Sequence, residues 1–140
     1  MSCMLRIYGT DLDIDGFIQK TDIVPYTKYY KGDPLLKSKP KGKKCKDSGL
    51  LVTASDADFD QLDIQINDTI AFLNLNAEKL QHIRTTKEID GALLNFGIEL
   101  RMGFKDVVFQ FDRFPAELLR LAGEFSIDLG ISLYPPPDED

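Results

Sequence analysis

The densest group of candidate metal-binding side chains is the stretch DLDIDGFIQKTD, residues 11–22. It places aspartates at relative positions 1, 3, 5 and 12 and glycine at position 6, the spacing of an EF-hand calcium loop. An EF-hand loop follows a helix, however, whereas the residues before this stretch alternate as in a strand. At position 12, Asp22 is one methylene shorter than the usual bidentate glutamate. We therefore predict a helix that is capped by Asp11 or Asp13 and binds no metal. The carboxylate of Asp15 would be stabilised at the positive end of the helix dipole. Calcium binding is the alternative.

The second candidate site is a lysine-rich segment. Residues 28–46 hold eight lysines and one aspartate, a net charge of +7. The whole chain has a net charge of −6, so the remaining residues carry −13. Tyrosines beside the lysines could stack bases while the ammonium groups hold phosphates, but lysine without arginine reads bases poorly. The acidic remainder also opposes nucleic-acid binding. We expect a loop that is solvated or docks on the protein's own acidic surface. The alternative is a binding site formed by Tyr29, Tyr30, Lys41, Lys43 and Lys44.

Residues suited to catalysis are sparse. His82 is the only histidine, it has no serine or cysteine near it in sequence, and we interpret it as a surface residue. The aspartates between residues 56 and 63 are explained by solvation and by the dipole of the helix that they open. The chain lacks the GxGxxG, GxxxxGK[ST], HExxH and GxSxG motifs of nucleotide-binding proteins, metalloproteases and hydrolases. The sequence favours a protein without catalytic activity and without a cofactor.

The cysteines and the hydropathy pattern bear on the cellular compartment. Cys3 and Cys45 lie far apart without a CxxC spacing, which predicts two free thiols and no zinc site. No apolar run approaches the roughly 20 residues that span a bilayer. The start, MSCMLRIYG, lacks the basic end and long apolar middle of a signal peptide. We expect a cytoplasmic protein that does not enter membranes.

The length of 140 residues, with 43% hydrophobic and 29% charged residues, predicts one domain over residues 1–134. An acidic, proline-rich tail follows at 135–140. Period-2 alternation indicates strands and spacings of three and four residues indicate helices. In the N-terminal half we expect strands at 3–8 and 50–54, helices at 13–21, about 59–73 and from 76, and a basic loop at 26–48.

In the C-terminal half, alternation over 94–102 and 107–111 around the turn sequence MGFKD predicts a β-hairpin. Proline at position 115 opens a helix, and a last strand covers about 127–133. The order β-α-β-α-(α)-β-β-α-β predicts an α+β two-layer sandwich, a mostly antiparallel sheet of about five strands with helices on one face. Its core should contain Phe96, Phe109, Leu118 and Ile131.

Two parts of the chain carry a resemblance to a known family. The start, LRIYGTDLDIDGF followed by KGDP, and the end, FPAELLRLAGEFSIDLGISLY, resemble the small bacterial family called domain of unknown function 4279. Members of that family tend to carry a tryptophan after the basic loop, where this chain has Gly49-Leu50-Leu51. The resemblance implies a fold and a bacterial setting, and it implies no catalytic residues.

From these observations we expect a small non-catalytic binding or interaction module with a protein partner that the sequence does not identify. One version is an immunity-like protein that neutralises a basic toxin through its acidic surface. The alternatives are a nucleic-acid or polyanion binder using residues 26–46, and an enzyme whose cleft the sequence does not reveal. The oligomeric state does not follow from the sequence.

Overall fold

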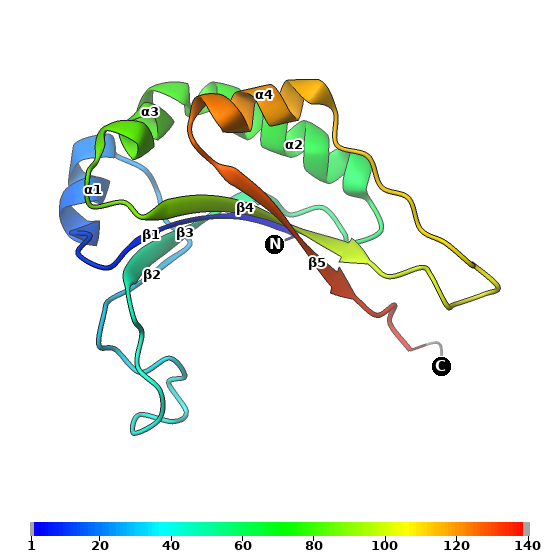
Figure 1. The fold of residues 1–140 in the computed structure, drawn as a ribbon, viewed down its shortest axis with the longest axis horizontal. Coiled ribbons are helices and arrows are strands. Elements are labelled where there is room, and N and C mark those ends of the chain that lie inside the picture. Colours follow the sequence, from blue (N-terminus) through cyan, green and yellow to red (C-terminus); the bar gives the residue numbers. More distant parts are fainter. Residues whose placement is uncertain (1, 139–140) are drawn as a thin grey trace.

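A computed structural model describes residues 2–138 of the chain, which form one α+β unit (Figure 1). Along the chain, the elements are β1 (Cys3–Gly9), α1 (Ile14–Thr21), β2 (Thr27–Tyr29), β3 (Ser48–Ser55), α2 (Leu62–Leu75), α3 (Ala77–Thr85), β4 (Gly91–Glu99), α4 (Ala116–Glu124) and β5 (Asp128–Tyr134).

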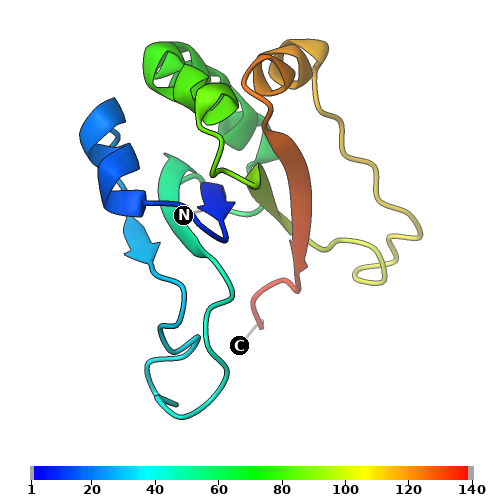
Figure 2. The ribbon, with the colours of Figure 1, turned by 60° about the vertical axis from the view of Figure 1, so that its left-hand side comes forward.

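The five strands form one sheet in the order β2-β3-β1-β4-β5, in which only the β4–β5 pair is parallel. Helix α4 makes the crossover that a parallel pair requires. Figures 1 and 2 show the helices gathered on one side of a curved sheet, while its other face is left open. The predicted fold class, a mostly antiparallel five-stranded sheet with helices on one face, is confirmed.

The core lies between the helices and the central strands. In β1 every second residue is buried, so Leu5 and Ile7 point to the helices and Arg6 points to the open face. From β4, the fully buried Phe96 packs its ring against Phe114 with 5.1 Å between ring centroids. The remaining large, fully buried apolar side chains are Ile14, Leu50, Leu73, Leu80, Leu94, Ile98 and Leu118.

The predicted hairpin is wrong in its second half. Residues 107–111 form no strand, and the fifth strand of the sheet is instead the short β2. The side chain of Gln110 bonds the Arg101 amide at 2.7 Å and the Glu99 carbonyl at 3.2 Å, so a side chain stands where a backbone ladder was expected. Phe109 is consequently 72% exposed, and its predicted place in the core is wrong.

Ile131 also lies outside the core, although it belongs to the predicted last strand. It sits on β5 opposite Phe96 in the parallel register, on the face that the helices cover elsewhere. The later part of β5 extends beyond the helices (Figure 1), which leaves Ile131 54% exposed. Of the four predicted core residues, Phe96 and Leu118 are buried as expected.

Candidate functional site

A groove of about 980 Å³ opens between the open face of the sheet and the lysine-rich segment. Three strands contribute to it: β1 through Arg6, β2 through all three of its residues and β3 through Leu51. The segment between β2 and β3 supplies the remaining wall, formed by Asp33, Pro34, Leu35, Lys37, Lys43, Lys44, Cys45, Lys46 and Asp47.

That segment, residues 30–47, is an ordered hairpin and is called the basic hairpin below. Its two limbs pair through the backbone, since Leu35 N–H bonds the Lys43 carbonyl at 2.8 Å and Cys45 N–H bonds the Asp33 carbonyl at 2.7 Å. At its base, the amide of Lys31 donates to Ser48 Oγ at 2.9 Å. Figure 1 shows the basic hairpin projecting from the sheet on the side away from the helices. We expected irregular loop structure here, and the local pairing was not predicted.

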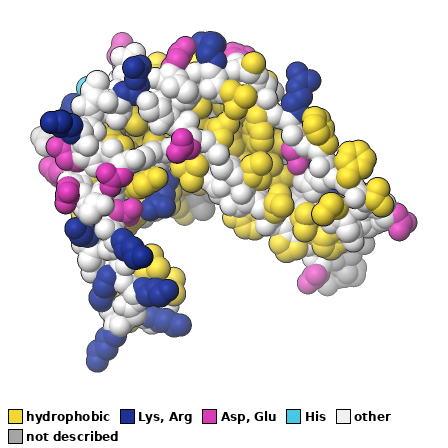
Figure 3. All heavy atoms as spheres, in the orientation of Figure 1, with side chains coloured by type: hydrophobic (Ala, Val, Ile, Leu, Met, Phe, Trp, Pro, Cys, Tyr) yellow, Lys and Arg dark blue, Asp and Glu magenta, His cyan; other side chains and the backbone are white. Residues whose placement is uncertain are grey.

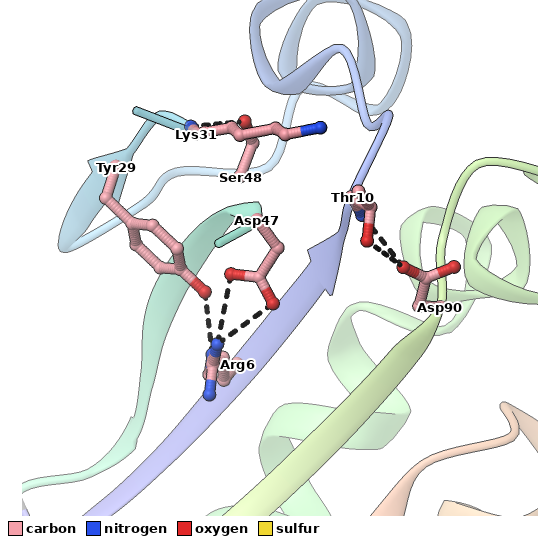
Figure 4. Close-up of polar contacts among 7 residues, drawn as sticks. All are labelled: Arg6, Thr10, Tyr29, Lys31, Asp47, Ser48 and Asp90. Atoms are coloured by element: carbon pink, nitrogen blue, oxygen red, sulfur yellow. Dashed lines mark hydrogen bonds and ion pairs between the residues drawn. The ribbon is translucent and has the colours of Figure 1, made fainter. Parts of the chain in front are cut away.

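Arg6 anchors the floor of the groove (Figure 4). Its Nε donates to the Tyr29 hydroxyl at 2.7 Å, and its guanidinium forms an ion pair with Asp47 at 3.3 Å. The guanidinium also lies 4.6 Å from the centre of the Tyr8 ring, within range of a cation–π contact. Burial opposes the charge of Arg6, but the Tyr29 hydroxyl and Asp47 outweigh it, so the pKa of Arg6 is raised. For Tyr29, in contrast, burial opposes the charged phenolate and raises the pKa, against the effect of Arg6.

The sheet leaves space for the Tyr29 ring at Gly49, its partner in the β2–β3 register. A Cβ at position 49 would collide with the ring and hydroxyl of Tyr29. Glycine there therefore lets the ring lie flat on the sheet, where its hydroxyl reaches Arg6. The ring is held between the sheet and the groove, and it forms part of the wall.

The groove is strongly positive. Six of its lining residues are cations and two are anions, which leaves a net charge of +4. Arg6 pairs with Asp47, and Lys28 pairs outside the groove with Asp15 at 2.7 Å. Within residues 2–138, the lysines at 37, 43 and 46 form no ion pair, while Lys44 donates to the carbonyl of Pro40. Figure 3 shows these basic side chains clustered on the projecting hairpin.

The structure brings together three of the five predicted site residues. Tyr29, Lys43 and Lys44 line the groove. Tyr30 turns away to α1, where its hydroxyl donates to Asp15 at 2.9 Å, and Lys41 lies near the tip of the basic hairpin without lining the groove.

Sequence reasoning missed Arg6 and Asp47, although Arg6 gave one signal. Arg6 is the only charged residue in a strand of otherwise apolar alternation, so its side chain had to leave the core for the open face. Its partners Tyr29 and Asp47 lie 23 and 41 residues away, and no local pattern indicates them.

The calcium-like stretch folds as the predicted helix start. Asp13 is the N-cap of α1 and accepts the Gly16 amide at 3.0 Å, which confirms the predicted cap. Asp15 turns to Lys28 and Tyr30, whose hydrogen bonds lower the pKa of its carboxyl. Asp22 ends the helix with a left-handed backbone. Throughout the described chain, no three His, Cys, Asp or Glu side chains are grouped so that they could hold a metal ion.

The predicted surface histidine lies on α3, which covers one face of the sheet (Figure 1), whereas the groove is lined from the other face through Arg6. His82 is therefore not part of the groove. The sulfur of Cys45 is the only thiol among the lining residues, and it has no histidine beside it there to act as a base. The geometry of the groove suits binding through charge and contact.

No helix in the part of the chain that the structure describes is long and apolar enough to cross a membrane. Comparisons of the chain with models of protein families, with curated proteins and with solved structures found no match.

Proposed function

We propose that the protein is a non-catalytic binding module whose groove holds an acidic segment of a partner protein. The observation that carries this proposal is the net charge of +4 among the residues that line the groove. Three of these residues, Lys37, Lys43 and Lys46, form no ion pair within the described chain. Unpaired ammonium groups around one hollow attract carboxylates and raise the rate of encounter with an acidic partner.

The apolar part of the lining supports a polypeptide ligand. Pro34, Leu35 and Leu51 contribute hydrocarbon surface between the lysines, and the Leu35 side chain is mostly exposed. Apolar side chains of a bound segment could cover this surface while its carboxylates reach the ammonium groups. The groove therefore fits a segment in which acidic and apolar residues alternate.

One observation disfavours single-stranded nucleic acid as the ligand. Base stacking needs free aromatic faces, but the Tyr29 ring is part of the wall, and Lys28 lies over the Tyr30 ring with its Nζ 5.8 Å from the ring centre. The lysines of the groove act as point charges, which attract carboxylates without reading the edges of bases.

The experiment measures fluorescence anisotropy with a short labelled peptide of alternating glutamate and leucine. Its matched controls are the glutamine version of the peptide and an oligothymidylate of equal charge. We expect binding of the acidic peptide alone, with an affinity that falls several-fold as salt rises from about 50 to 200 mM. Tighter binding of the oligonucleotide would replace the peptide proposal with nucleic-acid binding.

A pair of double variants tests whether the groove is the site. The variant Lys37→Glu with Lys43→Glu reverses two groove charges, and the control, Lys39→Glu with Lys41→Glu, makes the same change on the same hairpin outside the groove. We expect the groove variant to lose about tenfold or more in affinity and the control to lose at most about threefold. Equal losses would mean that the overall charge of the hairpin, and not the groove, attracts the peptide.

An immunity-like partner would behave differently. A basic toxin bound by the acidic surface would be insensitive to both lysine variants, and lysine substitutions among the aspartates between 56 and 63 would weaken it. That outcome, with no binding of the acidic peptide, would replace our proposal with the acidic-surface alternative.

We further propose a cytoplasmic bacterial setting, in line with the family resemblance. The support is that both cysteines are free although Cys45 is partly exposed, as in a reducing compartment. Localisation of a tagged copy in a bacterial host, fractionated into cytoplasm and periplasm, tests the compartment.

A further inference from the structure

The segment between β4 and α4 exposes an unusual number of apolar side chains. This segment, residues 100–113, is called the apolar arm, and it projects from the end of the sheet opposite α1 (Figure 1). Val108 is 85% exposed and Phe111 73% exposed. The other exposed hydrophobic residues of the arm are Met102, Phe104, Val107 and Phe109.

Strand β5 continues this surface. Ile131 and Leu133, which share one face of the strand, are 54% and 57% exposed, whereas Tyr134 points to the other face and stacks on Phe59. A hollow of about 630 Å³ is lined both by Phe104 and Val107 of the arm and by Pro136 after β5, so the arm and the end of β5 adjoin. Figure 3 shows hydrophobic side chains spread over this end of the molecule, away from the charged hairpin.

The size of the surface exceeds what a monomer normally exposes. The exposed parts of the six side chains of the arm, Ile131 and Leu133 amount to on the order of 900 Å², since a single large aromatic side chain presents about 200 Å². The largest apolar patch on a typical monomer is about 300–600 Å². A stable protein interface buries about 800 Å² on each partner, so this surface is large enough for one.

Part of the backbone of the same region forms no ladder with another strand in the described chain. The sequence VVFQF at 107–111 has the alternation and the β-branched and aromatic residues of a strand. Within residues 2–138, the amides of 108–111 bond no backbone carbonyl. Strand β5 is the last of the sheet, so its outer edge also has no neighbouring strand among the described residues. An unpaired strand-like segment and an unpaired edge thus lie on one chain.

We propose that two copies of the chain associate through this surface, with residues 107–111 of each copy lying along the outer edge of β5 of the other. A two-fold axis places the segment of each copy on the edge of the other, so both unpaired elements are satisfied at once and the assembly closes as a dimer. The pairing also covers the aromatic side chains of the arm with the apolar side chains of β5.

The charges of this surface favour a second copy as the occupant. Residues 101–113 carry a net +1 and β5 carries −1, so the two elements that meet are of opposite sign and their sum is zero. The whole chain carries −6, so two copies repel each other less where these oppositely charged elements meet than where two acidic surfaces meet. Exposed Arg113 and exposed Asp128 are available for a contact between copies.

Sedimentation velocity over a range of protein concentrations tests the dimer. We expect a dimer of the wild-type chain at about 100 μM, and a monomer at the same concentration for Phe109→Asp with Phe111→Asp. The matched control, Val24→Asp with Leu75→Asp, changes side chains that are 78% and 87% exposed elsewhere, and it should remain dimeric. Circular dichroism checks that both double variants keep the fold.

A third variant tests the edge of β5. Leu133→Lys places a charge beside the edge, a device by which natural sheets prevent pairing, and it should also give monomers. A wild-type chain that stays monomeric at about 100 μM overturns the proposal and leaves the surface for a different protein. A dimer that survives the Phe109 and Phe111 changes, or an assembly that grows without closing, overturns it as well.

Discussion

The basic hairpin and the apolar arm project from opposite ends of the same sheet, and they are held in different ways (Figure 1). The basic hairpin is held by its backbone, through the pairing of residues 33–35 with 43–45. The arm has one short backbone turn, in which Gly103 N–H bonds the Val107 carbonyl at 2.8 Å, and beyond it the arm is held by side chains. Gln110 bonds the backbone at Glu99 and Arg101, and Arg101 forms an ion pair with Asp112 at 2.7 Å.

This difference determines what each segment can offer a partner. A backbone ladder satisfies its own polar groups whatever the side chains are, so the lysines of the hairpin are free to bind a ligand. The arm leaves both amides and apolar side chains exposed, and both are satisfied only by another strand. The backbone pairing of the basic hairpin is therefore formed without a partner, whereas the amides of residues 108–111 in the arm would be bonded only when a partner strand binds.

The largest expected effect is the difference in the free energy of unfolding between a substitution in the core and one in the arm. Phe96→Ala removes a fully buried ring, and we expect a loss of about 3–5 kcal/mol in the free energy of unfolding. Phe109→Ala, in the exposed arm, should change it by about 0.5 kcal/mol or less. Urea unfolding at low protein concentration, where no dimer forms, measures both. Similar losses would show that the arm packs as part of the core in solution.

The two thiols give the next contrast. Burial raises the pKa of Cys3 from 9.0 to about 12, so the folded chain holds this proton more tightly than the unfolded chain. The resulting stability is complete below pH 9 and is lost as the pH rises toward 12, by up to about 1.4 kcal/mol per pH unit. Unfolding of the wild type and of Cys3→Ala at pH 7 and about pH 10 measures the loss, which should be smaller in the variant because only other groups, such as Tyr29, then contribute to it.

Thiol labelling provides the matching observation on the hairpin. Cys45 lines the groove and should react with a thiol reagent in the folded protein, whereas Cys3, fully buried, should react only after unfolding. Rapid reaction of both thiols under native conditions would contradict the burial of β1.

The third prediction concerns the side chain that holds the arm. Gln110→Ala removes the hydrogen bonds to Glu99, Arg101 and Asp112, and we expect a loss of about 1–2 kcal/mol together with faster hydrogen exchange in the arm. Gln81→Ala, an exposed glutamine on α3, is the control and should have no effect on exchange in the arm. Unchanged exchange in Gln110→Ala would mean that the arm is held by other contacts.

The smallest effects are expected at two glycines with similar backbone angles. Gly32 in the basic hairpin has φ +90° and Gly103 in the arm has φ +87°, and neither has an atom close to the position of a Cβ. Alanine at Gly32 should cost about 1 kcal/mol through backbone strain alone. Alanine at Gly103 should cost less than half as much, since the arm can rearrange locally without loss of the sheet. Thermal unfolding of both variants decides, and a greater loss at Gly103 would reverse the comparison.

The elements that could be predicted from the sequence are those with local signals. Helix α1 was predicted with its cap because Asp13 and the buried Ile14 and Phe17 lie within five residues of one another. Strand β2 could not be predicted in this way. Its three residues, TKY, have no buried side chain, and they form a strand only because β3 offers them an edge to pair with.

The arm shows the opposite error. The alternation at 107–111 is a real property of the sequence, but a strand needs a partner strand. The predicted partner follows β4, and there the side chain of Gln110 bonds the backbone of Glu99 and Arg101 in place of a backbone ladder. In the groove, composition predicted Tyr29, Lys43 and Lys44. The contact of Arg6 with Asp47 depends on two strands and a hairpin coming together, which no window of sequence contains.

The position of β1 in the middle of the sheet has a consequence for synthesis of the chain. Its seven residues are made before the other strands of the sheet, yet its two neighbours are β3 and β4, and Leu5 pairs with Val52 on one side and Leu94 on the other. A growing chain therefore carries an apolar strand that lacks one of its two neighbours, β4, until residue 99 has left the ribosome, and most sheet contacts form between distant residues. Nascent chains stalled before β4 should consequently bind chaperones, and those stalled after β5 should be released from them.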